Sequence, residues 1–485
     1  MNWLLVALLA VPALGALAVR IRWAPTVAAA VAFGISVALG FGRHTGGLTG
    51  PIRPWHQVDL PWVPGLDLRF HLGVDGISYP LVVLTTLLTL LCCLYLLWTG
   101  EPVRGGGLAA LLLVIEFGIL GVFVALDLVL FFVFFEVVLL PMYAVIAVWG
   151  GPDRRAAARK FVLYTLLGSV LLLVGVFVVV SRSGTADLVA LTAGRGAALP
   201  RGTQLAAFIL LALAFAVKSP LWPLHTWLPD AHTEAPTVGS VILAGVLLKM
   251  GTYGLLRVGV GVLPDGARRV APVLGVLAVA AILVGGLVCL AQNELKRLIA
   301  YSSVGHMGFV LLGIATLTAA GFQAALIGNV AHGFITGLLF FLAGAIKVRT
   351  HTGALDELGG LRETAPRLSG ILGYTAIASL GLPGLAGFWG EAFAVIAAVQ
   401  RQRPLWTVLA VLAALGGALA AAYFLRLLYR VTHGPATPAV TGIARLSPGE
   451  LVAWAPLVVL ALVVGLLPAL VLGPAHDAVQ ALVTR

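Results

Sequence analysis

Charged residues are scarce in this chain. They make up 10% of its 485 residues, whereas hydrophobic residues make up 60%. Soluble globular domains carry about 25% charged residues, so this composition excludes an ordinary soluble protein. Because no polar segment is long enough to form a sizeable soluble domain, we expect an all-α polytopic membrane protein.

Cysteine is also rare. Cys92, Cys93 and Cys289 are the whole set, and all three lie in apolar stretches without a CxxC or CxxCH motif. This pattern excludes a disulfide framework, and it excludes an iron–sulfur cluster or haem attached through those motifs. We expect no cofactor and no metal in this chain.

Long apolar runs fill the remaining sequence. A membrane-spanning helix needs roughly 20 apolar residues. About fourteen stretches qualify, near residues 2–19, 25–41, 76–99, 107–126, 127–149, 159–181, 204–229, 236–257, 270–291, 296–316, 321–346, 369–400, 404–428 and 451–472. The first lacks a basic start and precedes another span, so we interpret it as helix 1, not a signal peptide.

The formal net charge of +11 does not indicate nucleic-acid binding. Lys and Arg in the loops of a polytopic protein usually reflect its orientation in the bilayer. They slightly favour the odd-numbered connections, which we therefore expect on the cytoplasmic side of the membrane, with lipid and no nucleic acid as partner.

Two lysines, Lys218 and Lys249, lie deep within apolar spans. A charge at that depth costs about 2.5–3.5 kcal/mol even on lenient insertion scales, so an intramembrane lysine indicates function. Five more titratable residues lie near the centres of five other spans: Glu116, Glu136, His306, His332 and Glu391. If all seven share one depth, they predict a proton relay through intervening water.

Two spans are interrupted. Pro220 and Pro223 break the seventh, and Pro383 and Gly384 break the twelfth. Irregular backbone inside a membrane must face protein or internal water, and paired broken helices are typical of transport sites. Their separation by five helices predicts two inverted five-helix repeats, helices 4–8 and 9–13.

The predicted repeats divide the chain into four parts. These are residues 1–106 with helices 1–3 and an outer loop, 107–257 and 258–430 with the two repeats, and 431–485 with helix 14 and a tail. The pattern VDLPWVPGLDLRFHLGV in the outer loop predicts a surface hairpin. Asp75 follows it, where an acid commonly caps a helix.

Four polar residues, His225, Asp230, His232 and Glu234, link helices 7 and 8. They either conduct protons or cap two helix ends. For the larger set of buried groups, the alternatives are structural ion pairs and haem ligation by His306 and His332. Metal binding is disfavoured because lysines in the same layer would repel a cation.

Several long motifs carry a family resemblance: FFVFFEVVLLPMYAVIAVWGG, KSPLWPLHTWLPDAHTEAPTVGSVILAGVLLKMGTYGLLR, YSSVGHMGF, NVAHG and LPGLAGFWGEAF. Together they resemble the antiporter-like subunits of respiratory complex I and the Mrp-type cation/proton antiporters over nearly the whole chain. The similarity is greatest to the M-type subunits of NADH:quinone oxidoreductase. Glu391 distinguishes them, because L-type, N-type and Mrp relatives typically carry lysine there.

The resemblance implies a proton-translocating subunit that works within a complex. It implies that Glu136 with Lys218 forms the input, that Lys249, His306 and His332 form the bridge, and that Glu391 releases the proton. The helix 4 glutamate of the family falls on Glu116. NADH, FMN, iron–sulfur clusters and quinone would belong to partner subunits, with subunits L and N as neighbours.

Three other functions are compatible with these motifs. The chain could be a subunit of an Mrp-type Na⁺(K⁺)/H⁺ antiporter, a membrane subunit of a related hydrogenase, or a non-conducting assembly subunit.

Overall fold

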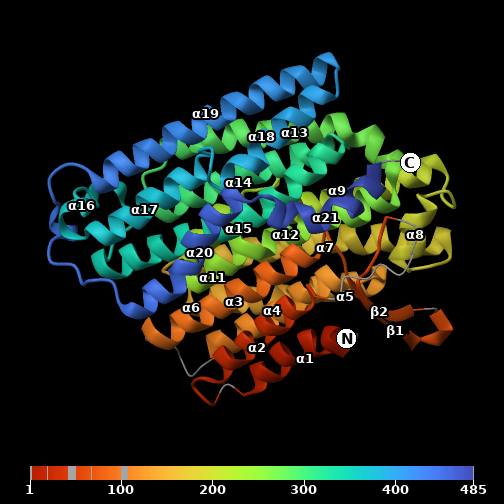
Figure 1. Ribbon diagram of the computed structural model, residues 1–485, viewed down its shortest axis with the longest axis horizontal. Coiled ribbons are helices and arrows are strands. Elements are labelled where there is room, and N and C mark those ends of the chain that lie inside the picture. Colours follow the sequence, from red (N-terminus) through yellow and green to blue (C-terminus); the bar gives the residue numbers. More distant parts are fainter. Residues whose placement is uncertain (1–2, 19, 42–50, 67, 100–106, 484–485) are drawn as a thin grey trace.

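The computed structural model describes residues 3–18, 20–41, 51–66, 68–99 and 107–483. The ends of the first expected span and part of the expected outer loop, residues 42–50, lie outside them. The described chain forms a bundle of helices that run side by side. Helix α19 (Pro404–Thr432) lies along one edge, and α1 (Trp3–Leu17) and α2 (Ala24–Ala38) lie along the opposite edge (Figure 1).

Eleven helical stretches among the described residues are long and apolar enough to cross a membrane. They are α3 (Tyr79–Thr99), α4 (Gly107–Val124), α5–α6 (Leu128–Val137 and Leu139–Trp149), α7 (Arg154–Ser183), α9 (Arg201–Lys218), the stretch Thr237–Val260, α13 (Pro264–Ala291), α14 (Leu295–Ala315), α15 (Ala319–Thr350), α19 and α20 (Pro448–Leu466). The prediction of an all-α polytopic membrane protein is confirmed, whereas the inverted repeats stay a prediction.

Shorter elements complete the chain. They are α8 (Leu188–Gly194), α10 (Trp227–Glu234), α16 (Leu361–Thr364), α17 (Pro366–Ser379), α18 (Gly387–Gln400), α21 (Ala469–Val483), and the turns η1 (Pro64–Leu66), η4 (Leu355–Glu357) and η5 (Pro438–Val440). The sequence predicted neither α8 nor α21. Helix α21 is a short apolar helix where we expected only a tail, and its residues pack against α15.

Both predicted helix breaks are present. Helix α9 ends at Lys218, and the turns that contain Pro220 and Pro223 separate it from α10. Lys218 is therefore the last residue of α9, directly before the break in the predicted seventh span. The second break, with Pro383 and Gly384, separates α17 from α18. Proline lacks the amide that a continuing helix requires, which explains why the helices end there.

The predicted hairpin is also confirmed. Strands β1 (His56–Val63) and β2 (Leu68–Val74) pair antiparallel, with His56 opposite Val74. The hairpin leads directly into Asp75 and α3, and it defines what we call the hairpin end of the bundle (Figure 1). Leu126, just after α4, donates its amide to the carbonyl of His71, so the hairpin is fixed to the helices.

The stretch Thr237–Val260 is the most enclosed part of the chain, and every one of its residues is buried. It runs as α11 (Thr237–Ile242), the π-helical turn η2 (Leu243–Leu247), α12 (Leu248–Gly254) and a second π-helical turn, η3 (Leu255–Val260). Such turns are rare and occur frequently at functional sites. We call this segment the enclosed helix.

The enclosed helix and α15 approach each other through glycines. A Cβ atom added to Gly333 of α15 would lie 2.9 Å from the carbonyl oxygen of Gly245 and 2.5 Å from Leu84 Cδ2. Only a residue without a side chain allows this spacing. The contact matters because Gly333 directly follows His332 and Gly245 lies one turn before Lys249.

We therefore expect Gly333→Ala to destabilise the chain by about 1–3 kcal/mol, because the extra methyl group must push two helices apart. Thermal unfolding of the purified, detergent-solubilised protein measures this. Gly337→Ala is the matched control one turn away, because its Cβ would lie 3.4 Å from Leu88 Cδ2, an ordinary contact. Equal melting temperatures for the two variants would contradict the expectation.

Candidate functional site

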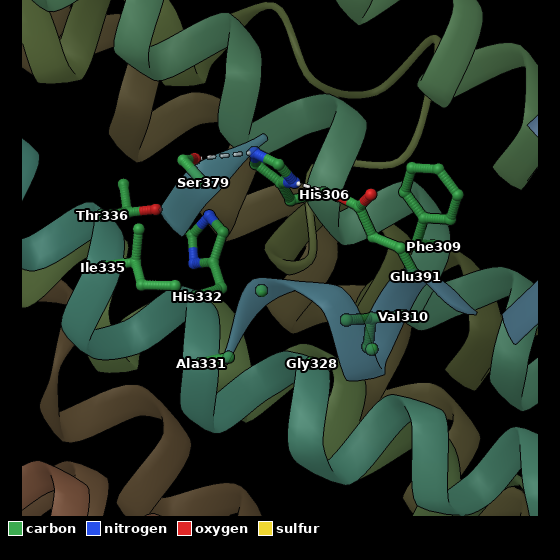
Figure 2. Close-up of a pocket in the computed structure, with 12 residues that line it drawn as sticks. His306, Phe309, Val310, Gly328, Ala331, His332, Ile335, Thr336, Ser379 and Glu391 are labelled. Atoms are coloured by element: carbon green, nitrogen blue, oxygen red, sulfur yellow. Dashed lines mark hydrogen bonds and ion pairs between the residues drawn. The ribbon is translucent and has the colours of Figure 1, made fainter. Parts of the chain in front are cut away.

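Four titratable residues form a connected row through the second half of the bundle. Lys249 on the enclosed helix contacts His332 on α15, the His332 ring lies 5.9 Å from that of His306 on α14, and His306 contacts Glu391 on α18. Four separate helices thus bring together residues that are far apart in the sequence. Figure 2 shows the histidine and glutamate part of this row.

Lys249 begins the row and is fully buried. Its Nζ atom lies 2.6 Å from the carbonyl oxygen of Ala244 and 2.6 Å from Nδ1 of His332. Ala244 belongs to the π-helical turn η2, so the irregular backbone supplies one of the two partners of the amine. An ammonium only donates hydrogen bonds, so when Lys249 is charged, Nδ1 of His332 must be the acceptor.

The other ring nitrogen of His332, Nε2, is buried and has no hydrogen-bond partner among the described residues. His332 lines a cavity of about 30 Å³ whose wall also contains His306, Ser379 and Glu391. That volume has room for about two water molecules. Water there can bridge the 5.9 Å between the two imidazole rings.

His306 uses both of its ring nitrogens. Nδ1 lies 3.0 Å from Oε1 of Glu391, and Nε2 lies 3.1 Å from Oγ of Ser379, the last residue of α17 (Figure 2). An imidazole held at both nitrogens can accept a proton at one and release it at the other. The break between α17 and α18 therefore places a hydroxyl and a carboxylate on opposite edges of one histidine.

The described residues in the first half of the bundle form no such row. Lys218 lies with its Nζ 5.0 Å from the centre of the Phe135 ring, and the charge of the neighbouring Glu136 acts on it. No ion pair joins Lys218 to Glu136 in the described part of the chain, and Glu136 Oε1 is buried without a hydrogen-bond partner there. Both residues lie at helix irregularities, since α5 ends at Val137 and α9 at Lys218.

Glu116 is separate from these groups. It is 1% exposed in α4, and neither carboxyl oxygen has a hydrogen-bond partner among the described residues. The thiol of Cys93 on α3 is a titratable group that interacts with it electrostatically. No hydrogen bond or ion pair joins Glu116 to the other six residues in the described part of the chain, and a common depth of all seven in a bilayer stays a prediction.

The polar link between α9 and the enclosed helix, with His225, Asp230, His232 and Glu234, contains two kinds of residue. Asp230 is ion-paired with Lys160 at 2.7 Å and with Arg297 at 3.5 Å, and Glu234 accepts a hydrogen bond from the amide of Asp153. Glu234 thus connects α10 to the loop after α6, and Asp230 connects α10 to α7 and α14. They fit the structural alternative, in which the link fixes helix ends.

The two histidines of the link differ from the carboxylates. His232 is fully buried and stacks on Phe340 at 4.5 Å, with both ring nitrogens unpartnered in the described structure. His225 lies with its ring 6.1 Å from that of Tyr301. The charges of Lys249 and Lys296 both act on His232, and Lys296 lies at the bundle end opposite the hairpin.

A cavity of about 920 Å³ opens at that opposite end, and its wall includes Glu234, Lys296 and Lys347. Lys296 is 5% exposed, and its Nζ lies 2.9 Å from the carbonyl oxygen of Ala235. The sequence analysis missed Lys296 because it lies at the start of a span, where a lysine is ordinary. Because Ala235 directly follows Glu234, the contact with Ala235 places Lys296 beside the polar link.

Haem ligation does not fit the geometry of the histidines. His306 has both nitrogens in hydrogen bonds, His332 shares one with Lys249, and the cavity between the two rings holds only about 30 Å³. Among the described residues, no group of three or more His, Cys, Asp or Glu side chains could hold a metal ion.

Sequence reasoning missed two further polar contacts. Thr252 of the enclosed helix donates a hydrogen bond to Asn329 of α15 at 2.9 Å, one turn from the Lys249–His332 contact. Asp75 pairs with Arg257 through a buried ion pair. Hydroxyl and amide side chains give no signal in an apolar span, and Arg257 lies at the predicted end of its span, where an arginine is ordinary.

The comparisons with known proteins agree with the fold. Residues 125–416 match the family described as "NADH:quinone oxidoreductase/Mrp antiporter, TM". NADH-quinone oxidoreductase subunit M of Rhodobacter capsulatus is 41% identical over 463 residues, which cover 93% of this chain and 88% of that protein.

Solved structures show the same likeness. A chain of respiratory complex I from Thermus thermophilus with bound NADH superimposes with a TM-score of 0.90 at 30% identity and covers 99% of both chains. A chain of the Mrp complex from Dietzia sp. DQ12-45-1b gives a TM-score of 0.87 at 25% identity, over 99% of this chain and 52% of that one. The chain therefore belongs to the NADH:quinone oxidoreductase/Mrp antiporter transmembrane family, within its group of NADH-quinone oxidoreductase M subunits.

Proposed function

We propose that this chain translocates protons as a membrane-arm subunit of a bacterial NADH:quinone oxidoreductase. The connected row Lys249–His332–His306–Glu391 is the observation that carries the proposal. NADH, FMN, iron–sulfur and quinone chemistry are assigned to partner subunits, and neighbouring antiporter-like subunits L and N are the expected contacts. Co-purification of those subunits from native membranes is the first test.

Like-charge repulsion makes the Lys249–His332 contact a transfer step. Two positive charges 4 Å apart repel by about 4 kcal/mol even at an effective dielectric near 20, and these nitrogens are 2.6 Å apart. The pair therefore holds one excess proton at a time. A proton that arrives at Lys249 displaces one from His332 toward the water-sized cavity.

His306 and Glu391 form the release step. A proton crossing the cavity binds His306, whose contact with the Glu391 carboxylate at 3.0 Å stabilises the charged imidazole. Transfer to Glu391 then neutralises both groups, and the loss of this proton from Glu391 to water on the outer side resets the row.

Lys218 and Glu136 form the switch that drives the row. They interact electrostatically without forming an ion pair in the described structure, so a small approach or separation changes their interaction strongly. Separation frees the charge of Lys218 to repel a proton on Lys249. Gly251 of the enclosed helix lies against Ser219, so the two lysine-bearing elements are in direct contact.

We expect Lys218→Ala and Glu136→Gln each to lower proton pumping and, through tight coupling, quinone reductase activity at least fivefold. Each change removes one charge of the switch. The measurement is NADH:quinone reductase activity and proton uptake in proteoliposomes containing the whole complex. Thr233→Ala, which changes a partly exposed residue of the polar link, controls for the effects of mutagenesis and purification. Normal pumping by an assembled Lys218→Ala complex would indicate a non-conducting assembly subunit.

We expect a graded series at the release step. Glu391→Gln removes the acceptor and should lower pumping at least tenfold, whereas Ser379→Ala removes one hydrogen bond to His306 and should lower it about two- to fivefold. Glu391→Asp keeps the charge at a greater distance and should fall between them. The same proteoliposome assay measures all three, and equal activity of Glu391→Gln and wild type would refute the row as the path.

An Mrp-type Na⁺(K⁺)/H⁺ antiporter subunit is the second candidate, because of the structural likeness to the Dietzia complex. It predicts proton uptake driven by a sodium or potassium gradient in the absence of NADH. The contact between Glu391 and His306 favours the first candidate, since a charged lysine at that position would repel a proton arriving on His306.

A further inference from the structure

A second polar row leaves Lys249 in a different direction. Lys249, Tyr253 and Arg257 follow at intervals of four residues, so they lie on one face of the enclosed helix. They span roughly 12 Å of helix axis toward the hairpin end. All three are buried, as is Asp75, which meets Arg257 at the start of α3.

Hydrogen bonds fix the orientation of every group in this row. Arg257 Nη2 lies 2.5 and 2.6 Å from the two carboxyl oxygens of Asp75, and Nε donates to the Tyr253 hydroxyl at 3.3 Å. The Tyr253 hydroxyl in turn donates to the carbonyl oxygen of Phe123. Asp75 also accepts hydrogen bonds from the amides of Ile77 and Ser78.

This orientation places the positive end of the ion pair toward Lys249. Arg257 reaches back to Tyr253, one turn closer to Lys249, while Asp75 lies on the far side at the hairpin end. A guanidinium remains charged in proteins, and a fixed arginine is one way in which channels exclude protons. The tyrosine proton is held by a backbone carbonyl and is not available for relay toward Asp75.

We propose that Arg257, positioned by Asp75 and Tyr253, blocks proton escape from Lys249 along the enclosed helix and so directs the proton sideways to His332. This inference rests on the proposed function. Without Arg257, the Tyr253 hydroxyl would be free to turn from Phe123 toward Asp75, and Tyr253 would then offer a route along the enclosed helix to the hairpin end. Arg257 is thus a positioning residue for the direction of transfer.

Stability alone does not account for the pair. A buried ion pair is weak evidence of stabilisation, because desolvation offsets most of the attraction. Arg257 also keeps Nη1 buried without a hydrogen-bond partner among the described residues. Apolar residues would fill the same space without that cost.

The test is passive proton conductance of the whole complex in proteoliposomes, without NADH, under an imposed potassium–valinomycin potential. The variant is Asp75→Asn/Arg257→Gln, which removes both charges and leaves no lone buried charge. We expect conductance to rise at least tenfold while quinone reductase activity stays above half, so that fewer protons are pumped per NADH. Adding Lys249→Ala should abolish the leak, because the leak starts there.

The matched control is Asp265→Asn/Arg268→Gln, an exposed ion pair at 2.9 Å, which should leave conductance unchanged. If the Asp75→Asn/Arg257→Gln complex does not assemble, Arg257→Lys tests the barrier instead. A lysine can lose its proton, and the barrier is then lost with its charge. The conductance of this variant should rise several-fold between pH 7 and 9, and wild-type conductance throughout would overturn the inference.

The outcomes separate this inference from the function on which it rests. Normal pumping by the single Lys249→Ala variant would reject the proposed relay. Defective pumping by that variant, together with wild-type conductance of an assembled Asp75→Asn/Arg257→Gln complex, would reject the barrier alone.

Discussion

The contact between Lys249 and His332 is the constraint on which the rest of the site depends. It requires a lysine with no exposure, a helix that is enclosed over its whole length, and a glycine pair that lets two backbones meet. An amine in that position must find its partners inside the protein, because water is excluded. The π-helical carbonyl of Ala244 and the imidazole of His332 are those partners, so the local irregularity and the relay have one cause.

The two halves of the bundle differ in a way that suits a driven process. In the second half the groups touch and form a row, whereas in the first half Lys218 and Glu136 lie near each other without an ion pair in the described structure. A connected row transfers charge but stores little energy. A separated acid and base in a low-dielectric interior respond strongly to small movements, which is why we propose that the first half controls transfer and the second half conducts it.

Much of this could be predicted from the sequence, because membrane burial leaves a strong signal. Apolar runs predicted the spans, prolines predicted the breaks after α9 and α17, and isolated charges singled out Lys249 and Glu391. The contacts between side chains on different helices could not be predicted. Ser379 has no signal of its own, and Asp75 was interpreted as a helix cap. It does accept amide hydrogen bonds from the following turn, yet its main partner is Arg257, 182 residues away.

Asp75 and Arg257 also show why counting buried charges is insufficient. Lys249 and Arg257 lie two turns apart on one helix face, and both are buried cations with acceptors nearby. Lys249 faces an imidazole that can exchange its proton, whereas Arg257 faces a carboxylate and cannot lose its own. Directional transfer needs both kinds of cation, since a row of exchangeable groups conducts along every branch open to it. The distinction follows from the chemistry of the two side chains and from the partner that the fold gives each one.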